Sequence, residues 1–338
     1  MKILNLSFED SAGAAYTLSH ALNKMPGISA INLRSNDNYI SYPAIAEIRH
    51  YNEMSCRQMV YDADVVVFHT AVLPFYSALH LDRNRMKDKK QLLYFHGSDC
   101  RTFGPQIMKQ ADEYMGKHEV LVSTPDLKLS YVPDAHWMPV ARSFSEIKRD
   151  YAMCNQDQSA LKAFKAEKIK VLLGHAPTSQ SRKGSDVFYK VITELVETFP
   201  NAEFVSIQNQ PWANCLRMMR NINIFYDQCL IGAYGCAAVE AAIFKASVFC
   251  LLDPDVMAMM EKESGLPNPF IQFANADVSR EKHELIPDTD ILRTQSFMLV
   301  DNPKLRRKFG NMAYEYCKKM HDEMPVAERF LKIVEGMD

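Results

Sequence analysis

Short, nearly uninterrupted apolar runs recur along this chain and constrain its fold more than any other feature. They are rich in Val, Ile, Leu and Phe, and polar and apolar positions do not alternate strictly within them. This pattern is typical of strands buried on both faces of a parallel sheet. The runs lie at residues 2–8, 28–34, 64–70, 91–98, 119–124, 169–176, 202–207, 222–228 and 246–252.

Stretches of helical period separate many of these runs, and this alternation favours a doubly wound α/β architecture. The clearest stretch predicts an apolar stripe on one helix face. Its members are Val187, Phe188, Val191, Ile192, Leu195, Val196 and Phe199. The 338 residues are too many for one typical core and suit two domains of about 150 residues each.

Composition excludes several classes of protein. The net charge of −2 gives no bulk attraction to nucleic acid. No apolar run reaches the roughly 20 residues that span a bilayer, and the N-terminal "MKILNLSFEDS" is read as a first strand, not a signal peptide. The 8 cysteines form no C-x-x-C pair, which disfavours structural zinc and indicates a reducing, cytoplasmic setting. The basic run at residues 82–90 is interrupted by acids, so a solvated loop is favoured over peripheral membrane contact.

Residues 142–168 break the strand rhythm and are polar, as expected for a linker with helical character. The chain is therefore divided into a first domain at 1–145, a linker at 146–168, a second domain at 169–315 and a helical C-terminal segment at 316–338.

Polar residues that follow the apolar runs are candidates for a site, because open parallel sheets bind ligands at the carboxyl ends of their strands. Gly13 lies in a turn before a helical stretch and would let an anionic ligand approach the backbone, although a plain loop explains this turn alone more simply. His96 and Asp99 belong to "HGSD". The histidine could give a proton to a substrate or bind its hydroxyls, or could hydrogen-bond a neighbouring loop.

A second candidate is the loop in which Arg182 and Lys183 precede a helix opened by Gly184, Ser185 and Asp186, with Ser185 as N-cap. Cations at a helix N-terminus are repelled by the dipole unless an anion bridges them. A diphosphate would do so, with Lys183 as a point charge and backbone N–H groups as donors. The alternative is a solvated basic turn.

A third candidate is Glu240, the single carboxylate of an alanine-rich helix that follows a glycine-rich turn ending at Gly235. An unpaired buried carboxylate costs on the order of several kcal/mol, so Glu240 needs a partner or an exposed position. Ribose hydroxyls could be that partner. A surface glutamate at the helix edge is the alternative.

Taken in order, these motifs resemble the GT-B glycosyltransferases, and most closely the retaining enzymes of glycosyltransferase family 4. The Gly13 turn, "HGSD" and residues 122–141 are similar to that family's first domain. The "RKG" loop and "GAYGCAAVEAAIFKASVFC" are similar to its second, where the E-G-F-G…E-A motif is matched by Tyr234, Gly235, Glu240 and Ala241. The resemblance implies two Rossmann-like doubly wound α/β domains facing across a cleft, with the C-terminal helix crossing back to the first domain.

The resemblance also implies roles for residues. Glu240 would hold the donor's ribose, Lys183 its diphosphate, and Gly13 would lie close to the phosphates. His96 would lie near the sugar and acceptor. The predicted site residues are His96, Asp99 and Asp227 for catalysis, and Gly13, Arg182, Lys183, Gly184, Tyr234, Gly235 and Glu240 for donor binding.

Two positions depart from the family pattern. The first glutamate of the motif, which contacts the transferred sugar, is replaced by Gly232, and the arginine usually found before the lysine is replaced by Thr178. Arg182 is a candidate to restore the missing positive charge, and Asp227 to supply a sugar-facing carboxylate.

The implied reaction is hexosyltransferase-like transfer of a sugar from a UDP- or GDP-linked donor to a hydroxyl of an unidentified glycan, lipid-linked or small-molecule acceptor, with retention. No metal or other cofactor is expected, because Lys183, Arg182 and helix N-termini would stabilise the leaving diphosphate. Two alternatives remain: a sugar-nucleotide epimerase on the same architecture, and a non-catalytic nucleotide-sugar-binding protein, for which Gly232 is the best support.

Overall fold

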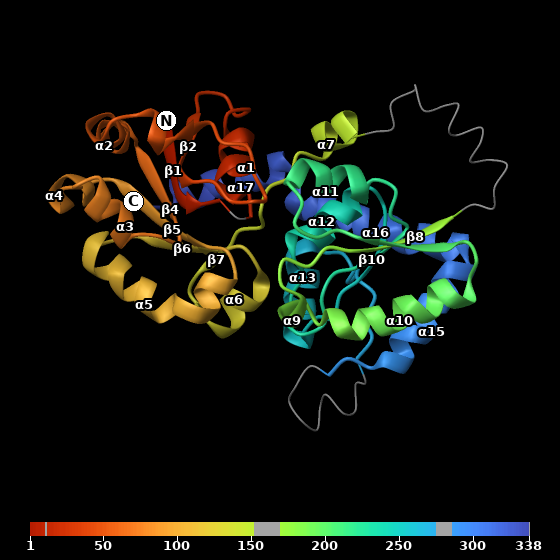
Figure 1. The fold of residues 1–338 in the computed structure, drawn as a ribbon. Coiled ribbons are helices and arrows are strands. Elements are labelled where there is room, and N and C mark those ends of the chain that lie inside the picture. Colours follow the sequence, from red (N-terminus) through yellow and green to blue (C-terminus); the bar gives the residue numbers. More distant parts are fainter. Residues whose placement is uncertain (11, 152–169, 275–285, 338) are drawn as a thin grey trace. The chain divides into compact units, whose positions relative to one another are not determined.

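The computed structural model describes residues 1–10, 12–151, 170–274 and 286–337, which form two compact units (Figure 1). Unit 1 comprises Met1–Ser143 and Met320–Asp338, and unit 2 comprises Phe144–Lys319. The start of the predicted linker, residues 146–151, belongs to a helix of unit 2, and the rest of it lies outside the described residues.

Unit 1 is built on a seven-stranded sheet of order β3-β2-β1-β4-β5-β6-β7, in which every neighbouring pair is parallel. Its strands are β1 (Lys2–Glu9), β2 (Ser29–Asn36), β3 (Ala46–Glu47), β4 (Val65–His69), β5 (Lys90–Phe95), β6 (Glu119–Val122) and β7 (His136–Trp137). Its helices are α1 (Ala14–Leu22), η1 (Ile48–His50), α2 (Glu53–Asp62), α3 (Leu73–Ala78), α4 (Arg83–Met86), α5 (Ser98–Tyr114), α6 (Pro125–Ser130) and α17 (Glu323–Glu335).

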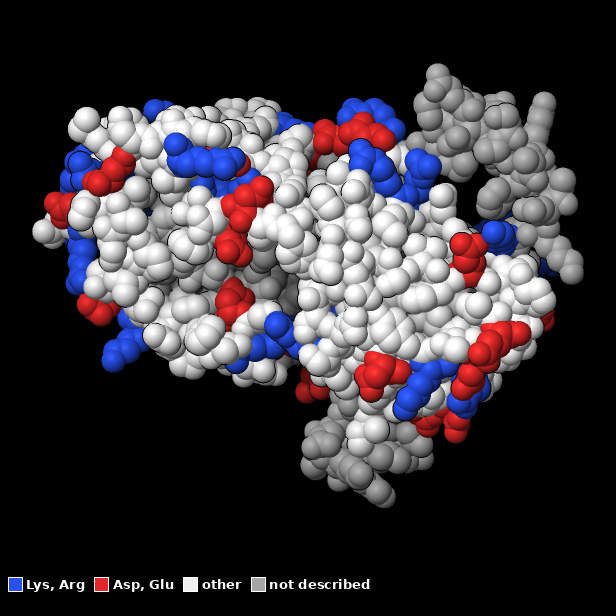
Figure 2. Space-filling model, viewed as in Figure 1, with Lys and Arg blue, Asp and Glu red and all other residues white. Residues whose placement is uncertain are grey.

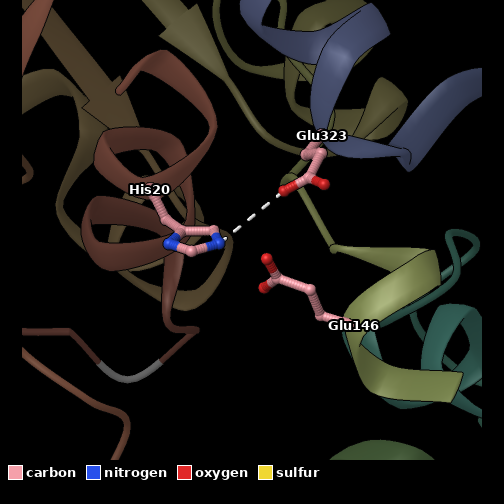
Figure 3. A group of neighbouring side chains, drawn as sticks. All are labelled: His20, Glu146 and Glu323. Carbon is pink, nitrogen blue, oxygen red and sulfur yellow. Dashed lines mark ion pairs between the residues drawn. The ribbon is translucent and has the colours of Figure 1, made fainter. Parts of the chain in front are cut away.

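The core of unit 1 combines the central strands with the C-terminal helix. All five residues of β4 are buried, as predicted for a strand covered on both faces. Helix α17 contributes Val326, Phe330 and Val334 to one apolar cluster with residues of α1 and of the central strands. Polar contacts reinforce this packing, since Glu323 accepts from Lys24 Nζ at 2.7 Å. Glu323 also lies 3.8 Å from His20 Nε2 of α1 (Figure 3).

Unit 2 has a four-stranded, wholly parallel sheet of order β11-β10-β8-β9. Its strands are β8 (Val171–His175), β9 (Ala202–Ser206), β10 (Ile224–Tyr226) and β11 (Ser247–Phe249). Its helices are α7 (Phe144–Tyr151), α9 (Gln180–Lys183), α10 (Ser185–Thr198), α11 (Trp212–Met219), α12 (Cys236–Ile243), α13 (Pro254–Ser264), α15 (Thr289–Asp301) and α16 (Pro303–His321).

Helix α10 covers the sheet of unit 2 with a narrower apolar stripe than the sequence predicts. Phe188, Val191, Ile192 and Leu195 are buried, but Val196 is 39% exposed. The stripe therefore follows i, i+3, i+4, i+7 spacing, and the prediction was wrong for Val196.

Charged side chains of both signs are intermixed on the face drawn in Figure 2. One pair on unit 2 joins α15 to α10, where Arg293 donates to Glu194 from both Nε (2.5 Å) and a terminal nitrogen (3.0 Å). The basic run at residues 82–90, predicted as a loop, instead contains α4, whose N-cap Asp82 accepts from the Asn84 N–H. Within the described ranges, no helix combines the length and apolar character needed to cross a bilayer.

Candidate functional site

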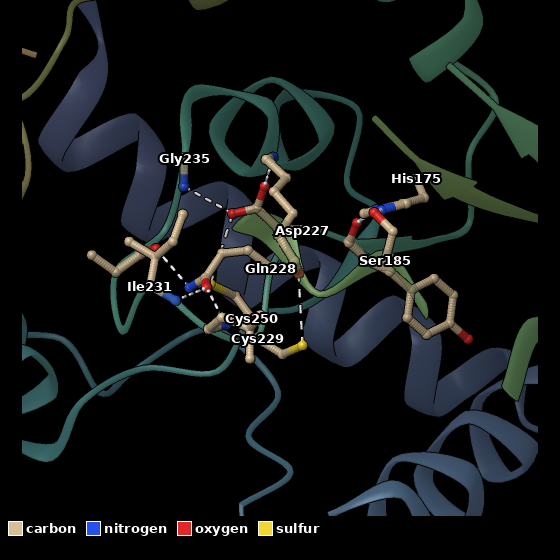
Figure 4. A network of polar contacts seen from close by, with 12 residues as sticks. His175, Ser185, Asp227, Gln228, Cys229, Ile231, Gly235 and Cys250 are labelled. Carbon is tan, nitrogen blue, oxygen red and sulfur yellow. Dashed lines mark hydrogen bonds and ion pairs between the residues drawn. The ribbon is translucent and has the colours of Figure 1, made fainter. Parts of the chain in front are cut away.

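The connection from β10 to α12 is organised by Gln228, a buried residue that the sequence-based prediction missed. Its amide nitrogen donates to the carbonyl oxygens of Ala233 (2.6 Å) and Leu251 (3.0 Å). Its amide oxygen accepts from the N–H groups of Leu230 (3.0 Å) and Ile231 (2.7 Å) (Figure 4). One side chain therefore satisfies the backbone of the glycine-rich turn and fixes its path toward the helix.

Asp227 and Lys183 form a buried ion pair at the start of α12. Lys183 Nζ lies 2.7 Å from Asp227 Oδ1, and the Gly235 N–H donates to Oδ2 at 2.8 Å (Figure 4). The side chain of Asp227 is fully buried, and that of Lys183 is 11% exposed. The carboxylate thus takes the anion position that the sequence assigned to a diphosphate. Arg182, its neighbour in α9, is exposed.

The loop that carries Lys183 depends on Gly184. Its φ of 68° is left-handed, and a Cβ there would lie 2.3 Å from Cys229 Sγ. Gly184 is the N-cap of α10, so the prediction that Ser185 caps this helix was wrong. The Ser185 hydroxyl instead contacts His175 Nε2 at 2.7 Å, while His175 Nδ1 lies 2.7 Å from the carbonyl oxygen of Tyr226. Burial lowers the pKa of His175 to about 4, so the ring is neutral. Its Nδ1–H donates to the Tyr226 carbonyl oxygen, and its bare Nε2 therefore accepts from the Ser185 hydroxyl.

Glu240 lies in the second turn of α12 and is only 3% exposed, which excludes the surface-glutamate alternative. Its Oε1 accepts from the indole N–H of Trp212, at the start of α11, at 2.8 Å. The sequence predicts that a buried Glu240 needs a partner, but it carries no signal that this partner is Trp212, because the two residues lie on different helices.

Tyr234, which precedes this helix, packs in the interior of unit 2. It is buried, its ring lies 5.0 Å from that of Phe270, and its hydroxyl lies 3.4 Å from the Tyr316 hydroxyl. These contacts give Tyr234 a packing role in the described structure.

In unit 1 the Gly13 turn is closed by the chain itself. Gly13 has a φ of 66°, and a Cβ on it would lie 2.3 Å from the ring of Tyr42. The first N–H groups of α1, from Ala15 and Tyr16, donate to Asp10 at 3.1 and 2.9 Å. The Tyr42 ring therefore fills the space beside Gly13 that the sequence assigned to a phosphate. Asp10 accepts from the N–H groups that would have bound that phosphate.

His96 and Asp99 lie where β5 passes into α5. The His96 N–H donates to Asp99 Oδ2 at 3.4 Å, and burial raises the pKa of Asp99. His96 Nε2 lies 2.8 Å from Nδ1 of a second histidine, His69, at the end of β4. The sequence-based prediction did not single out His69, although it ends an apolar run next to β5 in the sheet.

Solved structures similar to this chain were found, although no protein-family model and no curated protein sequence matches it. HepE of Anabaena, solved with UDP and glucose, is 12% identical with a TM-score of 0.64, covering 99% of this chain and 100% of HepE. Sucrose-phosphate synthase of Thermosynechococcus elongatus is 10% identical with a TM-score of 0.59, covering 100% and 99% of the two chains. UDP-GlcNAc 2-epimerase of Neisseria meningitidis, bound to UDP-GlcNAc, is 12% identical with a TM-score of 0.56 and full coverage of both chains.

The fold is GT-B. The prediction of two Rossmann-like α/β domains is confirmed by these similarities and by the two parallel sheets. At such low identity the similarity establishes the fold alone, so membership of glycosyltransferase family 4 stays a prediction.

Within this GT-B fold, three of the predicted site residues of unit 2, Lys183, Asp227 and Gly235, lie together at the start of α12. A Cβ placed on Gly235 would lie 3.7 Å from Lys183 Nζ and 3.5 Å from Asp227 Oδ1. Glu240 follows on the same helix. Gly13, His96 and Asp99 belong to unit 1, where each follows a strand of its sheet. The donor-binding and catalytic roles of all these residues remain predictions.

Proposed function

We propose that this protein transfers a sugar from a UDP- or GDP-linked donor to an acceptor hydroxyl, with retention of configuration and without a metal ion. The main support is the group at the start of α12, where a nearly buried ammonium, a carboxylate and a helix N-terminus meet. The GT-B fold adds support, since HepE was solved with UDP and glucose.

Lys183 is the residue that binds the donor diphosphate. An ammonium carries three N–H donors, and Asp227 accepts one of them. The other donors and the positive end of the α12 dipole are suited to phosphate oxygens. Asp227 holds the ammonium in place before the donor arrives, so little reorganisation accompanies the development of charge on the leaving diphosphate. Arg182 adds positive charge from the exposed side of α9.

Glu240 binds the ribose. A carboxylate has about four lone-pair sites, so one that accepts from the Trp212 indole at 2.8 Å can also accept from ribose hydroxyls. Trp212 fixes the orientation of the carboxylate and thereby the position of the nucleoside. In unit 1, His96 binds a hydroxyl of the transferred sugar or of the acceptor.

The reaction is tested by incubating the protein with UDP- and GDP-sugars, with and without a panel of acceptors, while measuring nucleotide release and the anomeric configuration of the product. We expect acceptor-dependent release and a retained anomer. Glu240→Gln should lower the rate about 10²-fold or more, whereas Lys190→Gln, an exposed residue of α10, should leave it unchanged. Equal rates in both variants would contradict the site.

A second candidate function is epimerisation of a nucleotide sugar, which the similarity to UDP-GlcNAc 2-epimerase of Neisseria meningitidis favours. The same incubation separates the two reactions. Epimerised donor formed without acceptor would establish the epimerase. Donor binding with neither reaction would favour a non-catalytic binding protein, as the glycine at position 232 suggests.

A further inference from the structure

A buried chain of hydrogen bonds in unit 1 runs from α1 to the end of β5. Asn5 Nδ2 donates to Ser19 Oγ at 2.8 Å, and Asn5 Oδ1 lies 3.0 Å from His69 Nε2. His69 Nδ1 lies 2.8 Å from His96 Nε2. Asn5 of β1, Ser19 of α1 and His69 of β4 are all buried. Burial keeps these side chains away from water, so their hydrogen bonds are to one another.

The direction of this chain follows from one group, the amide of Asn5. Its nitrogen donates to Ser19, so its oxygen is the atom that faces His69. An amide oxygen can only accept a hydrogen bond, so His69 must carry its proton on Nε2. A neutral His69 then has a bare Nδ1, which can only accept. His96 must donate from Nε2, and its own Nδ1 is left with a lone pair.

His96 Nδ1 has no hydrogen-bond partner among the described residues although the atom is buried. Tyr94 packs against the His96 ring at 4.2 Å between centroids, but its hydroxyl donates to the Met138 carbonyl oxygen. Such an unsatisfied acceptor costs folding free energy, and a ligand that supplies a donor would recover it. Burial also lowers the pKa of both histidines, that of His96 to about 3, which keeps the two rings neutral.

We propose that Asn5 and His69 are positioning residues that hold His96 as its Nε2–H tautomer and present Nδ1 as the acceptor for a hydroxyl of the bound sugar. The identity of that hydroxyl rests on the proposed function, whereas the tautomer does not. Neither Asn5 nor His69 touches the sugar; both act through the orientation and protonation of the His96 ring.

The tautomer is tested by ¹⁵N NMR of the full-length protein labelled at histidine, with the His96 resonances assigned from a His96→Gln variant. We expect a protonated, pyrrole-type Nε2 and a bare, pyridine-type Nδ1. The opposite orientation of the Asn5 amide would reverse every hydrogen bond of the chain, so a protonated Nδ1 on neutral His96 overturns the proposal. Asn5→Asp, which can only accept from His69, should leave the His96 signature unchanged.

The positioning role is tested by two variants at one position. The side-chain oxygen of His69→Asn can stand where His69 Nδ1 accepts, but His69→Leu offers no acceptor. We expect His69→Leu to show a mixture of His96 tautomers and to lower the transfer rate about tenfold, as for the loss of one hydrogen bond. His69→Asn should keep most of the Nε2–H tautomer of His96 and most of the transfer rate. An equal loss of tautomer preference and of rate in the two variants would mean that His69 only packs against its neighbours, and would overturn its positioning role.

Donor titration tests the ligand part. Added UDP-glucose should shift the wild-type Nδ1 resonance of His96, and an unmoved resonance on a protein that binds the donor would overturn this part. If the predicted tautomer is found but no donor is ever transferred or epimerised, the proposed function fails and the tautomer assignment stands.

Discussion

At the scale of single residues, the buried carboxylates of this protein are held by N–H groups of its own chain. Asp227 is held by Lys183 and a backbone amide, Asp10 by the first N–H groups of α1, and Glu240 by Trp212. Each charge therefore has a partner before any ligand binds, as buried charges require. A nucleotide-sugar donor must therefore bind alongside these existing hydrogen bonds and ion pairs.

The Trp212–Glu240 contact predicts a measurable coupling. Trp212→Phe keeps an aromatic ring but removes the donor to a buried carboxylate, so it should cost about 1.5–3 kcal/mol of stability, as for a hydrogen bond to a charged group. Combined with Glu240→Gln in a double-mutant cycle, urea denaturation should reveal a coupling energy of at least about 0.5 kcal/mol. Additive losses would show that the hydrogen bond contributes nothing.

His175 predicts a pH dependence of stability. Its pKa is lowered to about 4 in the folded protein by burial, whereas an unfolded histidine titrates near 6.5. Below pH 6.5 the unfolded chain therefore binds the extra proton, and the contribution of His175 to stability is lost as the pH falls from about 6.5 toward 4.

The measurement is urea denaturation of wild type and His175→Gln at pH 7 and pH 5. Between these values the wild type should lose about 2 kcal/mol more than the variant. An identical loss in both proteins would mean that His175 is not neutral and buried in the folded state.

At the scale of elements, the sequence predicts strands and helices well but predicts their ends poorly. Continuous apolar runs locate the buried strands, and β-branched and aromatic content separates them from helices. The N-cap of α10 was misassigned because a left-handed Gly184 and a hydroxyl directed at His175 depend on tertiary contacts. The first turn of a helix cannot be read from a local preference for serine alone.

The Gly184 turn predicts a position at which only glycine fits. Gly184→Ala must adopt a positive φ and place a methyl group against Cys229. Gly27→Ala is a matched control, because its φ is 73° but nothing lies within 4 Å of the added Cβ. We expect about 1–2 kcal/mol of destabilisation at Gly27, and about 1–3 kcal/mol more at Gly184 from overpacking, by chemical denaturation. Equal losses would refute the steric argument.

At the scale of the whole molecule, the chain folds as two units, and the first is completed by the last helix of the sequence. Composition and period predict two α/β domains. They could not pair Asn5 with His69, or Trp212 with Glu240, because each pair is separated widely in sequence and meets only in the folded unit. The site motifs were visible because each follows a strand, but their partners carry no local signal.

The C-terminal helix predicts that unit 1 can be weakened from the end of the chain. Phe330 of α17 is fully buried in unit 1, so Phe330→Ala should cost about 3–5 kcal/mol. Met324→Ala on the same helix is the control, since Met324 is 37% exposed. Hydrogen exchange should show lost protection in β1 and β4 with β8 and β10 unaffected. Equal loss of protection in both sheets would contradict the placement of α17 in the core of unit 1.

The most direct test of the central claim, that Lys183 held in place by Asp227 binds the donor diphosphate, is calorimetric titration of UDP and GDP into wild type and the Lys183→Met/Asp227→Asn double variant. The double variant leaves no unpaired buried charge, so it should fold, and circular dichroism verifies this. We expect at least one nucleotide to bind wild type and to bind the folded double variant about 10²-fold or more weakly. Equal affinity for the two proteins, or binding of neither nucleotide to wild type, would contradict the account.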